Sequence, residues 1–66
     1  MALLFYSPDD DAVAWRREML RRLPGLDFRI WPAVGDPAEI DLALVWRVPP
    51  GLLAGLPNLR VVLSLG

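Results

Sequence analysis

The chain has 66 residues, a net charge of −1, no cysteine and no histidine, and all seven of its basic residues are arginines. These properties exclude disulfides, thiolate metal sites and histidine-based acid–base catalysis, and the lack of a basic field argues against a nucleic-acid partner. Hydrophobic residues make up 55% of the chain, above the ~45–50% of typical domains. So much apolar surface on a short chain predicts that it packs against something else or forms part of a larger protein.

The chain carries no sign of a membrane segment or an export signal. No apolar run approaches the ~20 residues that cross a bilayer. The N-terminus lacks the cationic start of a signal peptide and becomes acidic at Asp9. We therefore expect a cytoplasmic protein with no membrane partner.

The first predicted elements are a buried strand and an amphipathic helix. Residues 2–6 form a short apolar run without alternation, which is typical of a central strand in a parallel sheet. Ser7 and Pro8 are expected to start a helix that runs to about Leu23, with the aspartates at positions 9–11 in its first turn. Its buried face is predicted from apolar residues at three-to-four spacing, namely Ala12, Trp15, Met19, Leu20 and Leu23.

The next two strands differ in character. Residues 27–31 alternate, with Phe28 and Ile30 on one face and charged residues on the other, which indicates an edge strand. A loop is expected from Pro32 to Glu39. Residues 42–46 are an unbroken apolar run closed by a polar residue and prolines, which indicates a strand covered on both faces.

A short helical turn at residues 51–55 and a fourth strand at residues 60–65 complete the pattern. Right-handed crossovers and an outer charged strand give a parallel sheet in the order 2-1-3-4. The predicted fold class is therefore α/β, a partial flavodoxin-like sheet with flanking helices. The fourth strand is apolar enough to be internal, yet nothing follows to pair with it. We therefore expect the sheet to be incomplete without further chain.

The best candidate site lies after the third strand, because ligands of open α/β sheets bind outside the carboxyl ends of the strands. Trp46 offers an apolar wall, and Arg47 offers a forked donor for a carboxylate. In the alternative interpretation, Trp46 packs under the following turn and Arg47 is solvated. Ser7 is expected to be a helix cap, since no base is present to activate it. A phosphoacceptor receiver domain is disfavoured because the third strand ends in Trp46 and Arg47 instead of an aspartate.

Several short motifs, taken in their order, resemble one enzyme family. They are Leu4-Phe5-Tyr6-Ser7-Pro8 before an acidic helix, Ala43-Leu44-Val45-Trp46 running into Pro49-Pro50, Leu53-Ala54-Gly55, Leu59-Arg60-Val61-Val62 and Leu63-Ser64-Leu65-Gly66. Over essentially the whole chain they resemble the D-isomer-specific 2-hydroxyacid dehydrogenases, and among these the glyoxylate/hydroxypyruvate reductase A type.

The resemblance implies that residues 1–66 form the N-terminal part of the substrate-binding domain of a two-domain oxidoreductase. The cofactor-binding Rossmann domain would lie outside this chain. The intact enzyme would use NADP or NAD to reduce a small 2-oxo acid, such as glyoxylate or hydroxypyruvate. The family's catalytic arginine, glutamate and histidine have no counterpart here. The chain alone is therefore expected to be inactive and to bind neither cofactor nor metal.

The resemblance also implies three substrate-binding positions. Trp46 matches the aromatic residue that lines the family's pocket, whereas Arg47 departs from the residue expected beside it. Gly66 stands where the family's chain enters a glycine turn whose backbone N–H groups hold the substrate carboxylate. Trp46, Arg47 and Gly66 are therefore the substrate-binding candidates.

A rival hypothesis is a free-standing α/β interaction module that completes its sheet with a partner chain. In both interpretations the partner lies along the strand between Arg60 and Leu65. It would be the remainder of the parent chain or a second copy.

Overall fold

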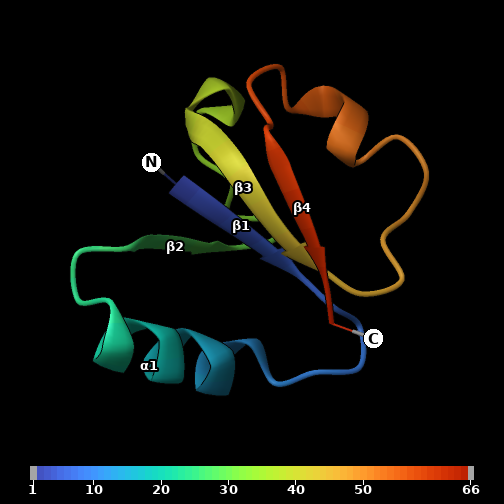
Figure 1. Ribbon diagram of the computed structural model, residues 1–66. Helices are drawn as coiled ribbons and strands as arrows, with labels where there is room; N and C mark the ends of the chain where they lie inside the picture. Colours follow the sequence, from blue (N-terminus) through green and yellow to red (C-terminus); the bar gives the residue numbers. More distant parts are fainter. Residues whose placement is uncertain (1, 66) are drawn as a thin grey trace.

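Residues 2–65, which the computed structural model describes, form an open parallel sheet with one α-helix against it (Figure 1). The strands are β1 (Ala2–Tyr6), β2 (Asp27–Ile30), β3 (Ile40–Val45) and β4 (Val61–Ser64). All pair in parallel, in the order β2-β1-β3-β4. The predicted sheet, its strand order and the edge position of β2 are confirmed. The two strands with unbroken apolar runs, β1 and β3, are the central ones.

The helix α1 (Ala12–Arg22) starts one turn later than predicted. Its N-cap is Asp11, whose carboxylate accepts hydrogen bonds from the backbone N–H groups of Val13 and Ala14, both at 3.1 Å. These N–H groups have no partner within the helix, so an aspartate at this position fixes where the helix begins. The prediction that Pro8 starts the helix is therefore wrong, and the first turn of α1 contains no acidic residue.

Ser7 caps a separate turn before the helix. Its Oγ accepts hydrogen bonds from the backbone N–H groups of Asp9 and Asp10, both at 3.2 Å. The same hydroxyl donates to the Asp10 carboxylate at 2.6 Å. Hydroxyl and carboxylate side chains that bond nearby backbone in this way compete with helix formation. The sequence predicted the capping role of Ser7 but placed it on the wrong element.

Two apolar clusters cover the two faces of the sheet. On the α1 side, Leu3, Phe5, Phe28 and Leu44 are buried, and four residues of the predicted helical stripe pack against them: Ala12, Trp15, Met19 and Leu20. The fifth predicted member, Leu23, is 53% exposed because it is the C-cap, with backbone angles outside the helix. Phe5 lies at the centre of the cluster, with its ring centroid 6.0 Å from that of Trp15 and 5.7 Å from that of Phe28.

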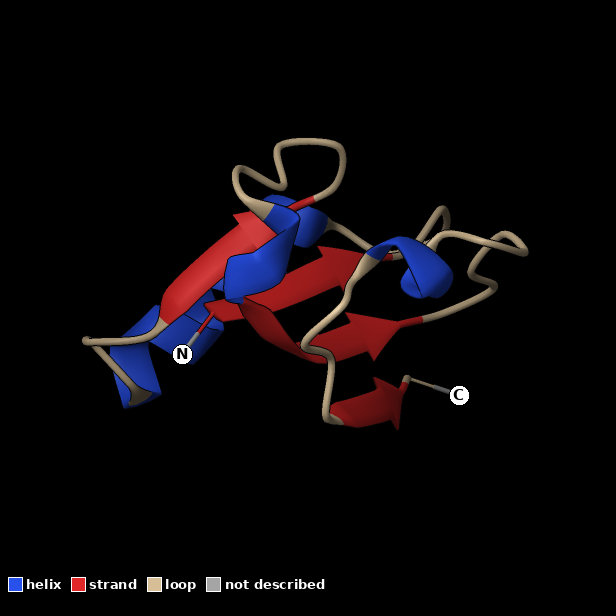
Figure 2. Ribbon diagram, turned by 90° about the horizontal axis from the view of Figure 1, so that it is seen from above, coloured by secondary structure: helices blue, strands red, loops and turns tan. Residues whose placement is uncertain are grey.

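The opposite face is covered by loops and short turns. Its buried residues are Ala2, Leu4, Ile40 and Leu56, and the partly buried side chains packed on them are Val34, Leu52, Leu53 and Leu59. The predicted helical turn is a 3-10 turn, η2 (Leu53–Gly55), and a second one, η1 (Pro37–Glu39), precedes β3. Figures 1 and 2 show these turns on the side of the sheet away from α1.

Asp41 is an extra residue in the pairing of β1 with β3. Ala2 pairs with Ile40 and Leu3 pairs with Leu42, so the register shifts by one residue at this point. Such a shift reverses the faces to which later side chains point. Ile40 accordingly belongs to the cluster away from α1, whereas Leu42 packs on the α1 side.

Arg29 fixes the loop between β2 and β3. Its side chain is only 17% exposed and forms ion pairs with Asp27 and Glu39, each at 2.8 Å. It also donates to the carbonyl oxygen of Val34 at 2.8 Å. These hydrogen bonds raise the pKa of Arg29 and lower that of Asp27. A charged residue expected only to protect a sheet edge thus also organises the following loop.

The outer edge of β4 is the least covered part of the sheet. All four residues of β4 are exposed, including Val61, Val62 and Leu63 at 43%, 48% and 49%. Within residues 2–65, β4 pairs only with β3, as expected for an apolar strand that lacks its outer neighbour. No helix in this part of the chain is long and apolar enough to span a membrane.

Candidate functional site

The topology places a switch point between the carboxyl ends of β1 and β3. After β1 the chain crosses to β2 on one side, and after β3 it crosses to β4 on the other. In open α/β sheets, such a reversal of direction marks the usual ligand site. The residues at this point are Tyr6, Ser7, Asp9, Trp46 and Arg47, here called the switch-point rim.

Aromatic side chains follow three adjacent strands at this end of the sheet. Hydrogen bonds continue the strand pairing into the rim, because the backbone N–H of Trp46 donates to Tyr6 O at 2.9 Å and that of Trp31 donates to Phe5 O at 3.0 Å. The Tyr6 and Trp31 rings meet edge to face, with centroids 6.4 Å apart and planes at 74°. Trp46 is half-buried and Trp31 is 41% exposed. Tyr6 and Trp31 therefore form an aromatic pair at this end of the sheet, and Trp46 lies at the end of the strand next to Tyr6.

Arg47 adds a cation at this end of the sheet. Its φ is +52°, a left-handed conformation that is uncommon for a residue with a side chain. Its Nε lies 3.5 Å from Oδ2 of Asp9, and the two side chains are 68% and 51% exposed. This ion pair joins the loop after β1 to the loop after β3. A guanidinium group at such a site can bind a carboxylate through two parallel hydrogen bonds.

Two of the three predicted site residues lie where the sequence placed them. Trp46 and Arg47 directly follow β3 at the rim, and Gly66 lies outside the described residues. Next to it, Leu65 donates its N–H to Val45 O at 3.0 Å, so the chain leaves β4 beside the end of β3. Asp9 was not predicted at this site. The signal was present, because Asp9 and Arg47 follow strands that are neighbours in the predicted order.

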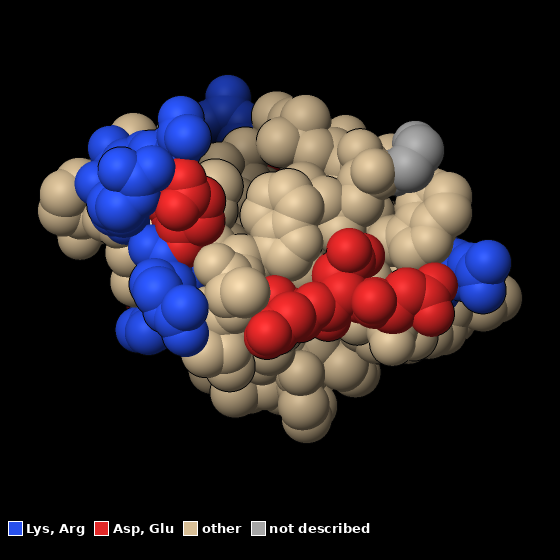
Figure 3. Space-filling view, turned by 90° about the horizontal axis from the view of Figure 1, so that it is seen from below, with Lys and Arg blue, Asp and Glu red and all other residues tan. Residues whose placement is uncertain are grey.

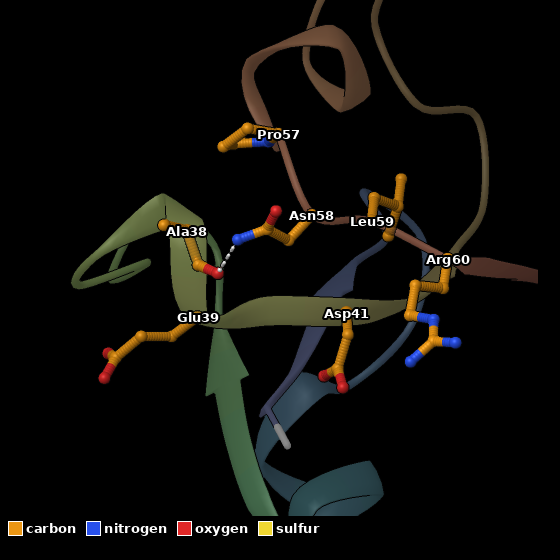
Figure 4. Close-up of a pocket in the computed structure, with 7 residues that line it drawn as sticks. All are labelled: Ala38, Glu39, Asp41, Pro57, Asn58, Leu59 and Arg60. Carbon is orange, nitrogen blue, oxygen red and sulfur yellow. Dashed lines mark hydrogen bonds between the residues drawn. The ribbon is translucent and has the colours of Figure 1, made fainter.

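A polar cleft of about 540 Å³ lies at the opposite end of β3 and β4 (Figure 4). Three of the polar side chains that line it are bonded to other parts of the fold. Asn58 donates to Ala38 O at 2.7 Å, and Asp41 Oδ1 accepts from the N–H of Ala2 at 2.9 Å. The carboxylate of Glu39 is held by Arg29. The switch-point rim, where the strand order reverses, is therefore the better candidate site.

The residues described here do not fit a dinucleotide site. Such sites need a glycine-rich turn between a strand and a helix, so that backbone N–H groups can approach the pyrophosphate. The corresponding turn after β1 carries aspartates at positions 9–11, which would repel phosphate. Figure 3 shows a band of acidic side chains across this face, with a basic side chain beside one end of it and a larger basic group, which surrounds a second acidic group, on the other side of the face. Among residues 2–65, no group of three possible ligands is placed to hold a metal ion.

Comparison with solved structures gives the class of protein. The chain superposes on a D-isomer-specific 2-hydroxyacid dehydrogenase from Xanthobacter autotrophicus Py2, solved in complex with NADPH and MES, with a TM-score of 0.92 and 44% identity. The match covers 98% of this chain and 22% of that one. A second structure of a D-isomer-specific 2-hydroxyacid dehydrogenase from the same organism gives a TM-score of 0.89 at 43% identity. The chain is thus homologous, over almost its whole length, to one part of such a dehydrogenase.

The curated relatives carry a more specific name. Glyoxylate/hydroxypyruvate reductase A from Photorhabdus laumondii is 38% identical over all 66 residues, and that from Serratia proteamaculans is 39% identical. The chain spans about a fifth of the length of these relatives. No family model matches the sequence. The expected resemblance to the glyoxylate/hydroxypyruvate reductase A type is confirmed for the segment that this chain represents.

Proposed function

We propose that residues 1–66 form the first part of the substrate-binding domain of an NAD(P)H-dependent 2-hydroxyacid dehydrogenase. The complete enzyme would reduce small 2-oxo acids, such as glyoxylate and hydroxypyruvate, to 2-hydroxy acids. The observation that carries the proposal is the TM-score of 0.92, at 44% identity, to a dehydrogenase solved with NADPH. A cytoplasmic location stays a prediction from the sequence.

In this proposal the chain binds substrate and leaves the chemistry to other parts of the enzyme. Trp46 would form an apolar wall beside the oxo acid, and Arg47 would bind its carboxylate through the guanidinium fork. Gly66 would begin a turn whose backbone N–H groups add to the same carboxylate site. Reduction of the keto group needs a hydride donor and a proton donor. The chain has no histidine to supply the proton, and the acidic turn after β1 argues against cofactor binding here.

The exposed edge of β4 would be covered by the remaining polypeptide. The residues Val61, Val62 and Leu63 are 43–49% exposed, and long apolar edges are hazards that native proteins avoid. The chain covers only 22% of the dehydrogenase it superposes on. The remaining chain in such a protein is long enough to supply both a fifth strand and a cofactor domain.

The proposal can be tested in a chimera, in which a relative supplies the rest of the enzyme. The 66 residues would replace the matching segment of the Photorhabdus laumondii relative, to which they align over their full length. We expect the chimera to oxidise NADPH in the presence of glyoxylate. The 66-residue chain by itself should show no turnover in the same assay. A chimera that folds and binds NADPH, but reduces neither glyoxylate nor hydroxypyruvate, would contradict the proposal.

One observation favours a second candidate, the interaction module. Among residues 2–65 no strand lies outside β4, so β4 could pair with a strand of another protein. The module interpretation predicts a stable, stoichiometric assembly of the 66-residue chain with itself or a partner. The enzyme interpretation predicts instead that the edge is covered only when the rest of a dehydrogenase is present. Light scattering of the isolated chain and of the chimera separates the two.

A further inference from the structure

The described arginines that form ion pairs differ in how firmly they are held. Arg29 is 17% exposed and makes two ion pairs at 2.8 Å, and Arg21 contacts Glu18 at 2.7 Å. Arg47 is 68% exposed, and its contact with Asp9 is 3.5 Å long. An N–H···O hydrogen bond in proteins spans about 2.7–3.2 Å. Arg47 is therefore attracted to Asp9 without being fixed by it.

The carboxylate of Asp9, by contrast, is presented by an ordered turn. The hydroxyl of Ser7 accepts from the N–H of Asp9 and also bonds Asp10. The N-cap Asp11 then begins α1. The turn thus starts from β1 at the switch-point rim and holds Asp9 opposite the loop that follows β3. An exposed cation with one long contact therefore faces a carboxylate on a hydrogen-bonded turn.

We propose that Asp9 is a positioning residue, which occupies Arg47 as an internal carboxylate until the carboxylate of a small 2-oxo acid replaces it. The inference rests on the proposed function and goes beyond it by naming the group that competes with substrate. After the exchange Arg47 is again paired with one carboxylate. Asp9, Asp10 and Asp11 all stay on the neighbouring loop, so the arrangement favours substrates with a single negative charge over dianions.

The φ of +52° at Arg47 is consistent with this role. Left-handed backbone is unfavourable for a residue with a side chain, and such conformations concentrate at functional sites. The conformation turns the chain away from β3 at the rim, so that the Arg47 side chain meets Asp9 on the neighbouring loop.

The test measures KM and kcat for glyoxylate in the chimera. Exposed ion pairs contribute up to about 1 kcal/mol, so Asp9→Asn should lower KM by about two- to fivefold and leave kcat unchanged. Asp9→Glu keeps the internal carboxylate and should keep KM near the original value. The matched control is Glu18→Gln, which changes the net charge equally near the C-terminal end of α1 and should leave KM unchanged. High salt should reduce the difference between Asp9→Asn and the original chimera.

Two results would overturn the inference and leave the proposed function standing. The first is an active chimera in which Asp9→Asn does not lower KM. The second is an equal effect of Asp9→Asn and Glu18→Gln, which would assign the change to net charge alone. A chimera that reduces no 2-oxo acid is a different outcome, because it contradicts the proposed function itself.

A binding measurement tests the role of Asp9 without enzyme activity. The Arg47 Nε–H resonance of the 66-residue chain would be followed by NMR during titration with glyoxylate, and with the neutral amide of glyoxylic acid as the control ligand. We expect glyoxylate to shift this resonance at lower concentration in Asp9→Asn than in the original chain. Identical titrations of the two chains, or no shift in either, would refute the proposal that Asp9 competes with glyoxylate for Arg47.

Discussion

Asp41 joins three of the four strands. Its side chain accepts a hydrogen bond from the N–H of Ala2 in β1, and its carbonyl oxygen accepts from the N–H of Arg60, just before β4. The side-chain bond is needed because the register shift leaves the Ala2 N–H without a carbonyl of β3 opposite it. Ala2 is 1% exposed, so water cannot replace the lost partner. A single carboxylate therefore holds one end of the sheet together.

We predict that Asp41→Ala lowers the free energy of unfolding by about 1–2 kcal/mol, the cost of leaving a buried donor unsatisfied. Asp41→Asn retains an acceptor oxygen and should lose less. Urea denaturation of the three proteins measures both effects. Equal stability of Asp41→Ala and the original chain would show that Ala2 finds another partner.

Sequence reasoning at the residue scale located some rim residues and missed others. Trp46 and Arg47 could be placed because their position depends only on where β3 ends. The predicted strand order brings the loops of Asp9 and Arg47 to the same end of the sheet, but it does not show that the two side chains form an ion pair. The contacts of Arg29 with Val34 and Glu39 could not be read from the sequence either. Each joins loops whose relative position is fixed only after the strands have paired.

At the scale of elements, α1 shows why helix starts are hard to predict. Ser7 with Pro8 and Asp11 with the following apolar stripe are both reasonable helix starts. The structure selects Asp11 because residues 7–10 satisfy one another in a separate turn. The periodic part of the helix was predicted correctly, since its apolar spacing depends on packing against the sheet and not on the cap.

A pH-dependent contribution to helix stability is predicted from Glu18. Hydrogen bonds from Arg21, and then from Arg22, lower the pKa of Glu18 from 4.5 to about 2. A carboxylate whose pKa falls on folding stabilises the folded state fully above pH 4.5. That contribution is lost as the pH falls from 4.5 towards 2. Because these side chains are largely exposed, the effect should be small and weakened by salt.

The measurement compares urea denaturation of the original chain and Glu18→Gln between pH 6 and pH 2. The difference in their unfolding free energies should be constant above pH 4.5 and shrink below it. A difference that stays unchanged down to pH 2 would mean that the ion pairs of α1 do not contribute to stability.

At the scale of the whole molecule, the strand order could be predicted but one layer could not. Unbroken apolar runs indicate that β1 and β3 are central, and charged residues indicate that β2 is an edge strand. With right-handed crossovers, only the strand order 2-1-3-4 agrees with both. The face away from α1 is covered by irregular segments that carry Val34, Leu52 and Leu59. Such segments have no periodicity, so their packing could not be inferred from a sequence pattern.

The free edge of β4 leads to a prediction about association. Val62 is 48% exposed on a strand with no outer neighbour among residues 2–65. Lysine on edge strands discourages pairing with other chains. Val62→Lys should therefore reduce concentration-dependent self-association of the 66-residue chain and leave its circular dichroism spectrum unchanged. Sedimentation velocity over a range of concentrations measures the association.

In the chimera, Val62→Lys should lower the thermal stability. If a further strand covers β4 there, a lysine at position 62 would lose part of its hydration, and the thermal midpoint should fall. An unchanged midpoint would indicate that this edge stays in water in the larger protein, against the proposed assembly.

The additional residue at position 41 also has a consequence for comparing this chain with its relatives. Because Asp41 is the extra residue, a one-residue gap there would leave Ile40 opposite Ala2 and Leu42 opposite Leu3, each on its present face of the sheet. A relative with such a gap would lose the carboxylate that accepts from the N–H of Ala2. A gap after position 42 would instead move Leu44 to the opposite face. Relatives should therefore tolerate a change of length at position 41 better than anywhere else in β3.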